Sequence, residues 1–229
     1  MRRETQNILL ILLGGALLKI SFSGLYLRYV QKGFLPLLVT AGTVMVLLAG
    51  FSIYRDVRGA RVPSHSHSTR STWLMLLPVL AVFLISPPAL GVDVVNSGTD
   101  TNRTSSSSNG FAALPGGDVV PLTLTDFVTR TAWDSSGTLD GRTVRLTGFL
   151  ARSSGHTYVA RLAISCCAAD ARPLKVHLVG DVPALPDEQW VEVTGRVIPG
   201  SASKENSYVP SFTVSSVNPV SAPLEPYES

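Results

Sequence analysis

A seven-residue pattern, TVRLTGF at residues 143–149, recurs as WVEVTGR at residues 190–196. In both copies apolar and polar residues alternate, as they do in a β-strand that buries one face. A glycine ends the alternation in each copy, at Gly148 and Gly195, where the missing Cβ lets a strand bend sharply. The pattern therefore predicts strands that curl into a small closed β structure.

Short alternating runs continue on both sides of these copies and are separated by Gly, Pro, Asp and Ser. We expect one short helix, near residues 125–133 and capped by Thr125 or Asp126. We expect five strands, at residues 142–151, 158–165, 174–179, 189–198 and 209–217. The fold predicted for residues 118–229 is an OB-like, five-stranded barrel, a small all-β domain with one short helix.

The composition divides the chain into two parts. Residues 1–91 carry nine Lys or Arg and two Asp or Glu, a net charge of +7. Residues 92–229 carry ten and fourteen, a net charge of −4. A basic, apolar first part and a mildly acidic second part indicate a membrane anchor followed by a water-soluble domain. Only two cysteines are present, which excludes a disulfide-dense secreted scaffold.

Three apolar stretches have the length that a bilayer crossing needs. We expect an α-helical membrane anchor of three transmembrane helices within residues 1–91, at residues 8–27, 34–53 and 73–90. The first stretch has an alternative interpretation as a signal peptide, because two arginines precede it and small residues follow it. Residues 92–117 are rich in Ser, Thr and Gly, which predicts a flexible tether between anchor and domain.

Basic residues near the expected spans predict their orientation. The amino terminus and the loop at residues 54–72 carry six Lys or Arg, and the loop at residues 28–33 carries two. Because basic loops stay in the cytoplasm, we expect a multi-pass membrane protein with a cytoplasmic N-terminus and an extracytoplasmic C-terminal domain. Five glycines would permit close helix packing: Gly14, Gly15, Gly24, Gly42 and Gly50.

Lys19 stands inside the first expected span, and two interpretations stay open. A buried ammonium usually faces a protein interior or a wet cavity, which makes Lys19 a candidate residue facing a partner in the membrane. Alternatively, its long stem snorkels to the surface of the bilayer.

Cys166 and Cys167 are adjacent, at the end of an expected strand. Three chemistries compete: packing in the core, a strained and easily reduced disulfide, and a soft-metal site for zinc or copper. The metal site would use both thiols and Asp170, with His177 or His156 as a further ligand. Both sulfurs can reach one ion only if the strand has already ended. A site with no metal at all is equally compatible with the sequence.

Other functional classes receive less support. His65 and His67 supply two imidazoles, which do not complete a tetrahedral metal site, so a solvated loop is the simpler interpretation. We expect no nucleic-acid partner, because the second part is acidic and its few aromatic residues occupy core positions. The sequence has no Ser-His-Asp arrangement, HExxH motif or phosphate-binding glycine loop, and we expect no enzyme.

The chain resembles the YcgQ-like bacterial membrane proteins, which are described as small subunits of a two-part permease. The resemblance lies in GFL at residues 148–150, RLAISCCAADARP at residues 161–173 and WV through Gly195. The CC-x-x-DA run is its specific part, and only the Ser-rich tether lies outside it. The resemblance implies a location in the bacterial cell membrane, with the lipid bilayer and a larger polytopic permease as partners.

Two functions follow as expectations. The first is an accessory, small subunit of a membrane permease, whose external β domain binds a soft metal or gates access. The second is a membrane-tethered, extracytoplasmic thiol or metal-binding module that acts without a transporter.

Overall fold

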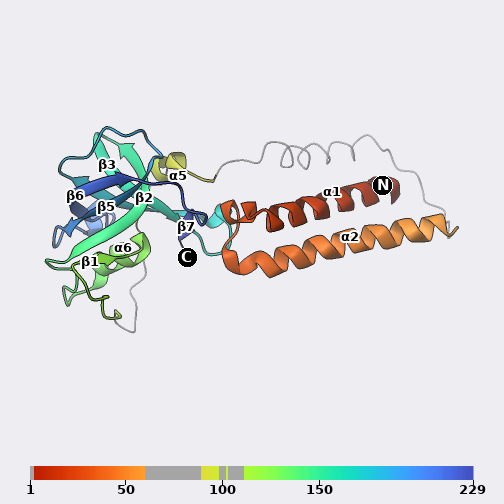
Figure 1. Ribbon diagram of the computed structural model, residues 1–229, viewed down its shortest axis with the longest axis horizontal. Coiled ribbons are helices and arrows are strands. Elements are labelled where there is room, and N and C mark those ends of the chain that lie inside the picture. The colour runs from red at the N-terminus through yellow and green to blue at the C-terminus, as the bar shows by residue number, and fades with distance from the viewer. Residues whose placement is uncertain (1–2, 60–88, 98–101, 103–110, 229) are drawn as a thin grey trace. The chain divides into compact units, whose positions relative to one another are not determined.

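The computed structural model describes residues 3–59, 89–97, 102 and 111–228 (Figure 1). The chain divides into two compact units, residues 1–89 and 90–229.

The described residues of the first unit form two α-helices, α1 (Arg3–Phe22) and α2 (Leu35–Val57), and two short 3-10 helices, η1 (Leu25–Arg28) and η2 (Lys32–Phe34). Gly24 follows α1 with a φ of 74°, a conformation that glycine adopts at little cost and that ends the helix. Pro36 stands in the first turn of α2, where its missing N–H leaves no bond unmade.

Gly14 of α1 and Gly42 of α2 bring the two helices into close contact. A Cβ added to Gly14 would lie 2.9 Å from the Gly42 carbonyl oxygen, and one added to Gly42 would lie 3.1 Å from the Gly14 carbonyl oxygen. The glycines therefore permit backbone-to-backbone packing. Gly15 and Gly50 meet no atom within 4 Å and take no part in it.

The expectation of three transmembrane helices is wrong. Among the described residues one helix, Lys32–Val57, is long and apolar enough to cross a membrane. The apolar part of α1, Gln6–Phe22, is shorter. The third expected span, residues 73–90, falls outside the described residues except at its last two positions. A membrane anchor and an N-terminal signal sequence both have the length and composition of Lys32–Val57.

The second unit is an all-β domain, and its described residues include two α-helices, α5 (Val92–Ser97) and α6 (Leu124–Trp133), and two 3-10 helices, η3 (Ala168–Asp170) and η4 (Lys204–Asn206). The strands are β1 (Val119–Pro121), β2 (Thr143–Ser153), β3 (His156–Ala163), β4 (Arg172–Val179), β5 (Trp190–Val197), β6 (Ser211–Pro219) and β7 (Tyr227–Glu228). Their order in the sheet is β1-β2-β5-β6-β4-β3-β7.

The sheet curls because β2 pairs with two strands in turn. Its residues 144–149 pair with β5 and its residues 149–153 pair with β3, both antiparallel. Gly148 lies where the pairing changes, and a Cβ there would stand 2.5 Å from the Ala160 carbonyl oxygen. Gly195 lies at a bulge between β5 and β6, and its Cβ would stand 2.1 Å from the Thr213 carbonyl oxygen. Both glycines thus allow close approach of a neighbouring strand.

The predicted OB-like five-stranded barrel is also wrong, because the sheet has seven strands and is mixed. The β1–β2, β3–β7 and β4–β6 pairs are parallel. Each of the five expected segments does overlap a strand, β2 to β6, with boundaries that differ by no more than two residues. The two strands that were not expected, β1 and β7, have three and two residues. They are too short for an alternation to show in the sequence.

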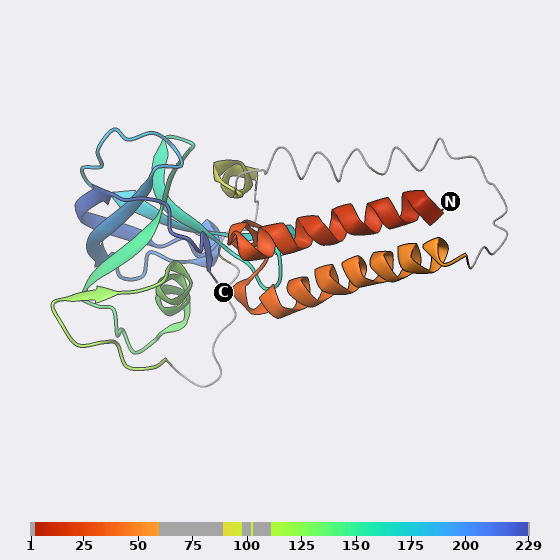
Figure 2. The same ribbon diagram turned by 45° about the vertical axis from the view of Figure 1, so that its right-hand side comes forward.

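The core lies between the curled sheet and α6 (Figure 2). Phe127 of α6 meets Phe212 of β6 edge to face, with ring centroids 5.4 Å apart, and both side chains are fully buried. The helix begins at Leu124, and the hydroxyl of the preceding Thr123 accepts a hydrogen bond of 3.0 Å from the Asp126 N–H. Thr123, and not the expected Thr125 or Asp126, is therefore the N-cap.

The described parts of the expected tether, residues 92–117, contact the sheet. Val95 of α5 is fully buried. The Asn102 side chain is 2% exposed and bonds to both backbone groups of Lys175 in β4, as a neighbouring strand would. Asn102 thus pairs with β4 through its side chain.

Candidate functional site

The two cysteines lie in a loop between β3 and β4, residues 164–171, which we call the dithiol loop. Ile164 is buried, and its N–H donates to the Glu228 carbonyl oxygen at 2.9 Å. Cys166 is exposed and Cys167 is half-buried. Because β3 ends at Ala163, neither cysteine is subject to the alternation of a strand. The strand has thus ended before the cysteines, as it must if both sulfurs are to reach one ion.

Asp170 closes the dithiol loop. One carboxylate oxygen accepts the Ser165 N–H at 3.0 Å and the other accepts the Cys166 N–H at 2.8 Å. The Asp170 N–H in turn donates to the Cys167 carbonyl oxygen at 3.0 Å. Partial loss of water acts to raise the pKa of Asp170, but the Ser165 and Cys166 N–H groups outweigh it, so this pKa lies below its ordinary value. Asp170 therefore holds the loop in shape.

The two sulfur atoms lie 3.4 Å apart, with the Cys166 thiol donating to the Cys167 sulfur. Both cysteines are free thiols. The hydrogen bond to Cys167 raises the pKa of Cys166, and so do the hydrogen bond to Asp170 and the negative charge of that carboxylate. The resulting pKa is about 11. Cys166 is thus a protonated thiol at neutral pH and a poor nucleophile, since the thiolate is the reactive form. An ion that binds here must displace a proton.

The other expected ligands do not join the cysteines. His156 begins β3 and His177 lies opposite Tyr158 on β4, whereas the cysteines follow the far end of β3. The seven residue steps from His156 to Ala163 span about 23 Å of strand. In the part of the chain that the structure describes, no group of three or more His, Cys, Asp or Glu side chains is placed to hold a metal ion. The geometry provides a two-sulfur site with a structural carboxylate behind it.

The dithiol loop falls within a region with a known domain model. Residues 128–228 match the DUF1980 C-terminal domain. The match takes in β2 to β7 and every residue of the loop. It is consistent with a membrane-associated family of unestablished role and leaves the resemblance to YcgQ-like proteins a prediction. No curated protein and no solved structure matches the chain.

Lys19, the other residue singled out from the sequence, stands in the last turn of α1 and is exposed there. Its position is compatible with either interpretation given above, and its role stays a prediction.

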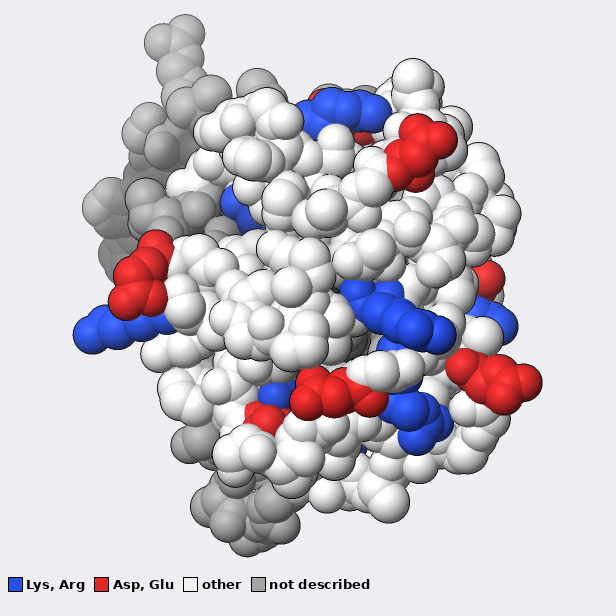
Figure 3. Space-filling view, turned by 90° about the vertical axis from the view of Figure 1, so that its left-hand side faces the viewer, with Lys and Arg blue, Asp and Glu red and all other residues white. Residues whose placement is uncertain are grey.

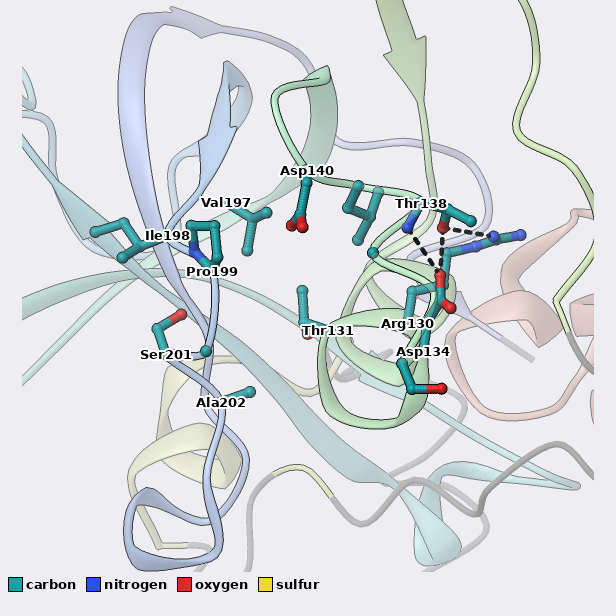
Figure 4. Close-up of a pocket in the computed structure, with 14 residues that line it drawn as sticks. Arg130, Thr131, Asp134, Thr138, Asp140, Val197, Ile198, Pro199, Ser201 and Ala202 are labelled. Carbon is teal, nitrogen blue, oxygen red and sulfur yellow. Dashed lines mark hydrogen bonds between the residues drawn. The ribbon is translucent and has the colours of Figure 1, made fainter.

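The DUF1980 domain also has a pocket of about 270 Å³, which the sequence analysis did not anticipate (Figure 4). It lies between the loop after α6, residues 134–140, and the end of β5 with the loop that follows it, residues 197–202. Asp140 points into it (Figure 4). Its one guanidinium, that of Arg130, is buried and bonds to Asp126, Thr138 and the Ala112 carbonyl. The pocket therefore offers no cation to a ligand from that residue.

Asp134 shapes one wall of this pocket. Its carboxylate accepts hydrogen bonds from the N–H and hydroxyl groups of Ser136 and Thr138. Loss of water acts to raise the pKa of Asp134, but these four bonds outweigh it and lower the pKa to about 2. The sequence signal is the DSSG run at residues 134–137, in which Gly137 adopts a φ of 66°.

Charges on the surface of the DUF1980 domain are mixed. On the face shown in Figure 3, Lys and Arg side chains alternate with Asp and Glu side chains. That face presents no continuous positive band of the kind that tracks a nucleic-acid backbone.

Proposed function

We propose that this protein is a membrane-tethered accessory subunit whose DUF1980 domain captures a soft metal or metalloid ion at Cys166 and Cys167. The observation that carries the proposal is the 3.4 Å separation of two free sulfurs on a loop that Asp170 holds in shape. Soft thiolate ligands select zinc, Cu(I) and similar ions. The raised pKa of the Cys166 thiol argues against nucleophilic catalysis at neutral pH, and a captured ion must displace the thiol proton.

The sulfur separation also selects among soft ions. Two sulfurs bound at about 2.3 Å to a tetrahedral ion lie about 3.8 Å apart, whereas a linear S–metal–S arrangement needs about 4.6 Å. The observed 3.4 Å is close to the first value and far from the second. We therefore favour an ion that accepts a bent pair of thiolates, such as zinc or a trivalent metalloid, over two-coordinate Cu(I).

The test uses the full-length protein in detergent with a phosphine reductant. Titration with Cd²⁺, a spectroscopic stand-in for zinc, should give a thiolate-to-metal charge-transfer band of one ion per chain. Cys166→Ser and Cys167→Ser should each abolish the band, and Ser165→Ala, which keeps both thiols, should preserve it. Wild-type protein that develops no such band, or a band that survives either cysteine substitution, would contradict the proposal.

The partner of this subunit is, in our proposal, a larger permease. Two features support it: the resemblance to the small subunits of two-part permeases and the exposed apolar side chains along α2. These include Leu37, Leu47, Phe51 and Val57, each more than 60% exposed. Such side chains lie against lipid or another membrane protein. Co-purification of a polytopic protein after mild solubilisation should be observed, and recovery of this chain alone at every detergent strength would count against the partnership.

We further propose that the DUF1980 domain lies outside the cytoplasm. Residues 55–70 carry four arginines, whereas no Lys or Arg occurs between residues 71 and 102. This asymmetry retains the basic segment inside. The domain then lies outside if the chain crosses the membrane after residue 70, in the stretch that falls outside the described residues. Because Cys166 and Cys167 are the only cysteines, a membrane-impermeant maleimide should label the protein in intact, reductant-treated cells. Labelling that requires lysis would place the domain inside.

A further inference from the structure

His156 and His177 meet on one face of the β3–β4 ladder, remote from the dithiol loop. His156 is the first residue of β3, directly after the turn residues Ser154 and Gly155. Both turn residues have positive φ, 52° and 80°, as a two-residue hairpin turn of type I′ requires. Two steps further along β3, Tyr158 pairs with His177. The turn and the register together place the two imidazoles side by side.

The spacing of the two rings is close to that of two imidazoles bound to one metal ion. Their centroids lie 4.8 Å apart and their planes are at 90°. Two imidazoles bound to one ion, with metal–nitrogen distances of about 2.0–2.1 Å and a tetrahedral angle, have centroids about 5 Å apart. The backbone therefore already brings the rings to chelating separation. His156 is exposed, so its ring can turn a nitrogen toward the ion.

Ser211 orients the second ring. The Nδ1 atom of His177 lies 3.4 Å from the Ser211 hydroxyl oxygen, which β6 places beside His177 in the parallel β4–β6 pair. A histidine that binds a metal through one nitrogen usually donates its other N–H to an oxygen, which fixes the tautomer. Contact with Ser211 at Nδ1 leaves Nε2 for an ion. Tyr158 flanks His177 with ring centroids 5.6 Å apart, and the Lys175 ammonium lies 5.9 Å from the centre of the Tyr158 ring.

We infer that His156 and His177 form a second metal site, for a divalent transition-metal ion such as Cu²⁺ or Ni²⁺. The inference rests on the ring separation and on the contact between His177 and Ser211. Imidazole suits these borderline ions, whereas adjacent thiols select softer ones. The domain thus presents two sites of different ligand chemistry at opposite ends of β3. With two protein ligands, the second site leaves its remaining coordination positions to water.

The test uses Cu²⁺ as the probe, because it binds nitrogen ligands most tightly among these ions. The parent protein is the full chain in detergent with Cys166→Ser and Cys167→Ser, so that thiols neither bind nor reduce the ion. Two test variants of this parent carry His156→Asn or His177→Asn. The matched control variant carries His65→Asn and His67→Asn together. We expect each substitution at the site to weaken Cu²⁺ binding by more than about tenfold, the loss that removing even an outer partner causes. The control pair should leave a one-ion site intact.

A measurement on the parent protein alone guards against variants that fail to fold. Electron paramagnetic resonance of the first equivalent of Cu²⁺ should show coupling to two imidazole nitrogens. Affinity unchanged in both single variants, loss of the site only in the control pair, or a spectrum without two imidazole nitrogens would overturn the inference. Because the parent lacks both thiols, none of these outcomes bears on ion capture at Cys166 and Cys167.

Discussion

The Glu228 carboxylate, next to the end of the chain, binds Thr125 at the start of α6 twice: it accepts the backbone N–H at 2.7 Å and the hydroxyl at 2.6 Å. It also accepts the Leu124 N–H at 2.9 Å and lies 3.5 Å from the Arg161 guanidinium. Its side chain is 4% exposed. A carboxylate at this place satisfies the free N–H groups of the helix and interacts favourably with the helix dipole.

Glu228→Gln should therefore destabilise the DUF1980 domain by about 2 kcal/mol, the usual worth of hydrogen bonds to a buried charge. The measurement is thermal unfolding of the full-length protein in detergent, followed by near-UV circular dichroism. Asp181→Asn makes the same chemical change at an exposed position and should leave the unfolding midpoint unchanged. Equal midpoints for the two variants would show that the bonds to α6 do not stabilise the fold.

Asn102→Ala should destabilise the domain by about 2 kcal/mol, because it leaves the Lys175 backbone groups without a partner in a buried place. The Asn102 amide donates to the carbonyls of Lys175 and Tyr208 and accepts from the Lys175 N–H, each at 2.9 Å. Asn96→Ala is the control: that exposed amide makes one long bond, 3.4 Å, to the Arg152 carbonyl. Urea unfolding of the two variants should differ in midpoint, and similar midpoints would refute the strand-like role of Asn102.

Gly195→Ala should destabilise the DUF1980 domain, because the bulge between β5 and β6 could then form only if the two strands moved apart. The added methyl group would lie 2.1 Å from the Thr213 carbonyl oxygen and 2.8 Å from the Phe212 ring. Overpacking of this kind costs about 1–3 kcal/mol or more. Gly116→Ala is the matched control, since a Cβ there meets no atom within 4 Å. Soluble yield and thermal midpoint should fall only for Gly195→Ala, and a variant as stable as the control would mean that the strands separate easily.

The alternation at residues 143–149 and 190–196 was sufficient to predict β2 and β5, because each strand has one buried face and a glycine at its bend. Their neighbours β3, β4 and β6 followed from the same alternation. The sheet order could not be predicted in this way. Pairing of β7 with β3 depends on a contact between Leu162 and Tyr227, which are far apart in the chain, and two residues carry no periodic signal.

The candidate sites were partly visible in the sequence. The adjacent cysteines were evident, but the use of both Asp170 oxygens by backbone N–H groups depends on the 3-10 turn at residues 168–170. The sequence suggested His156 or His177 only as a further ligand of a metal ion bound by the two cysteines. Their proximity follows from the hairpin register, which places Tyr158 opposite His177, and the sequence alone did not specify that register.

Asp134 should make the domain less stable in acid over a defined range. Its pKa in the folded protein, about 2, lies below the ordinary value of 3.8. A lowered pKa contributes stability that is complete above the ordinary value and is lost as the pH falls through the folded value. The difference in unfolding free energy between wild type and Asp134→Asn, about 1 kcal/mol at pH 7, should therefore shrink between about pH 4 and pH 2. A difference that stays constant over this range would contradict the role of the Ser136 and Thr138 bonds.

Asp170→Asn should make Cys166 more reactive. In the wild type, the bonds to Cys167 and Asp170 and the nearby negative charge raise the Cys166 pKa to about 11, so that alkylation by iodoacetamide should increase with pH well beyond the usual thiol range. The substitution removes the charge and one of the bonds, which lowers the pKa and increases the thiolate fraction at any pH below it.

Rates at Cys166 can be measured by mass spectrometry of peptides from the full-length protein between pH 7 and pH 11. Arg172→Gln, which loses only the 3.4 Å bond to the Ser165 hydroxyl, should follow the wild-type profile. The ordering of the rates separates the two roles that Asp170 could have. If Asp170 served only to shape the loop, Asp170→Asn would change the rates of Cys166 and Cys167 alike, whereas control of the thiol pKa by its charge requires a shift in the pH profile of Cys166.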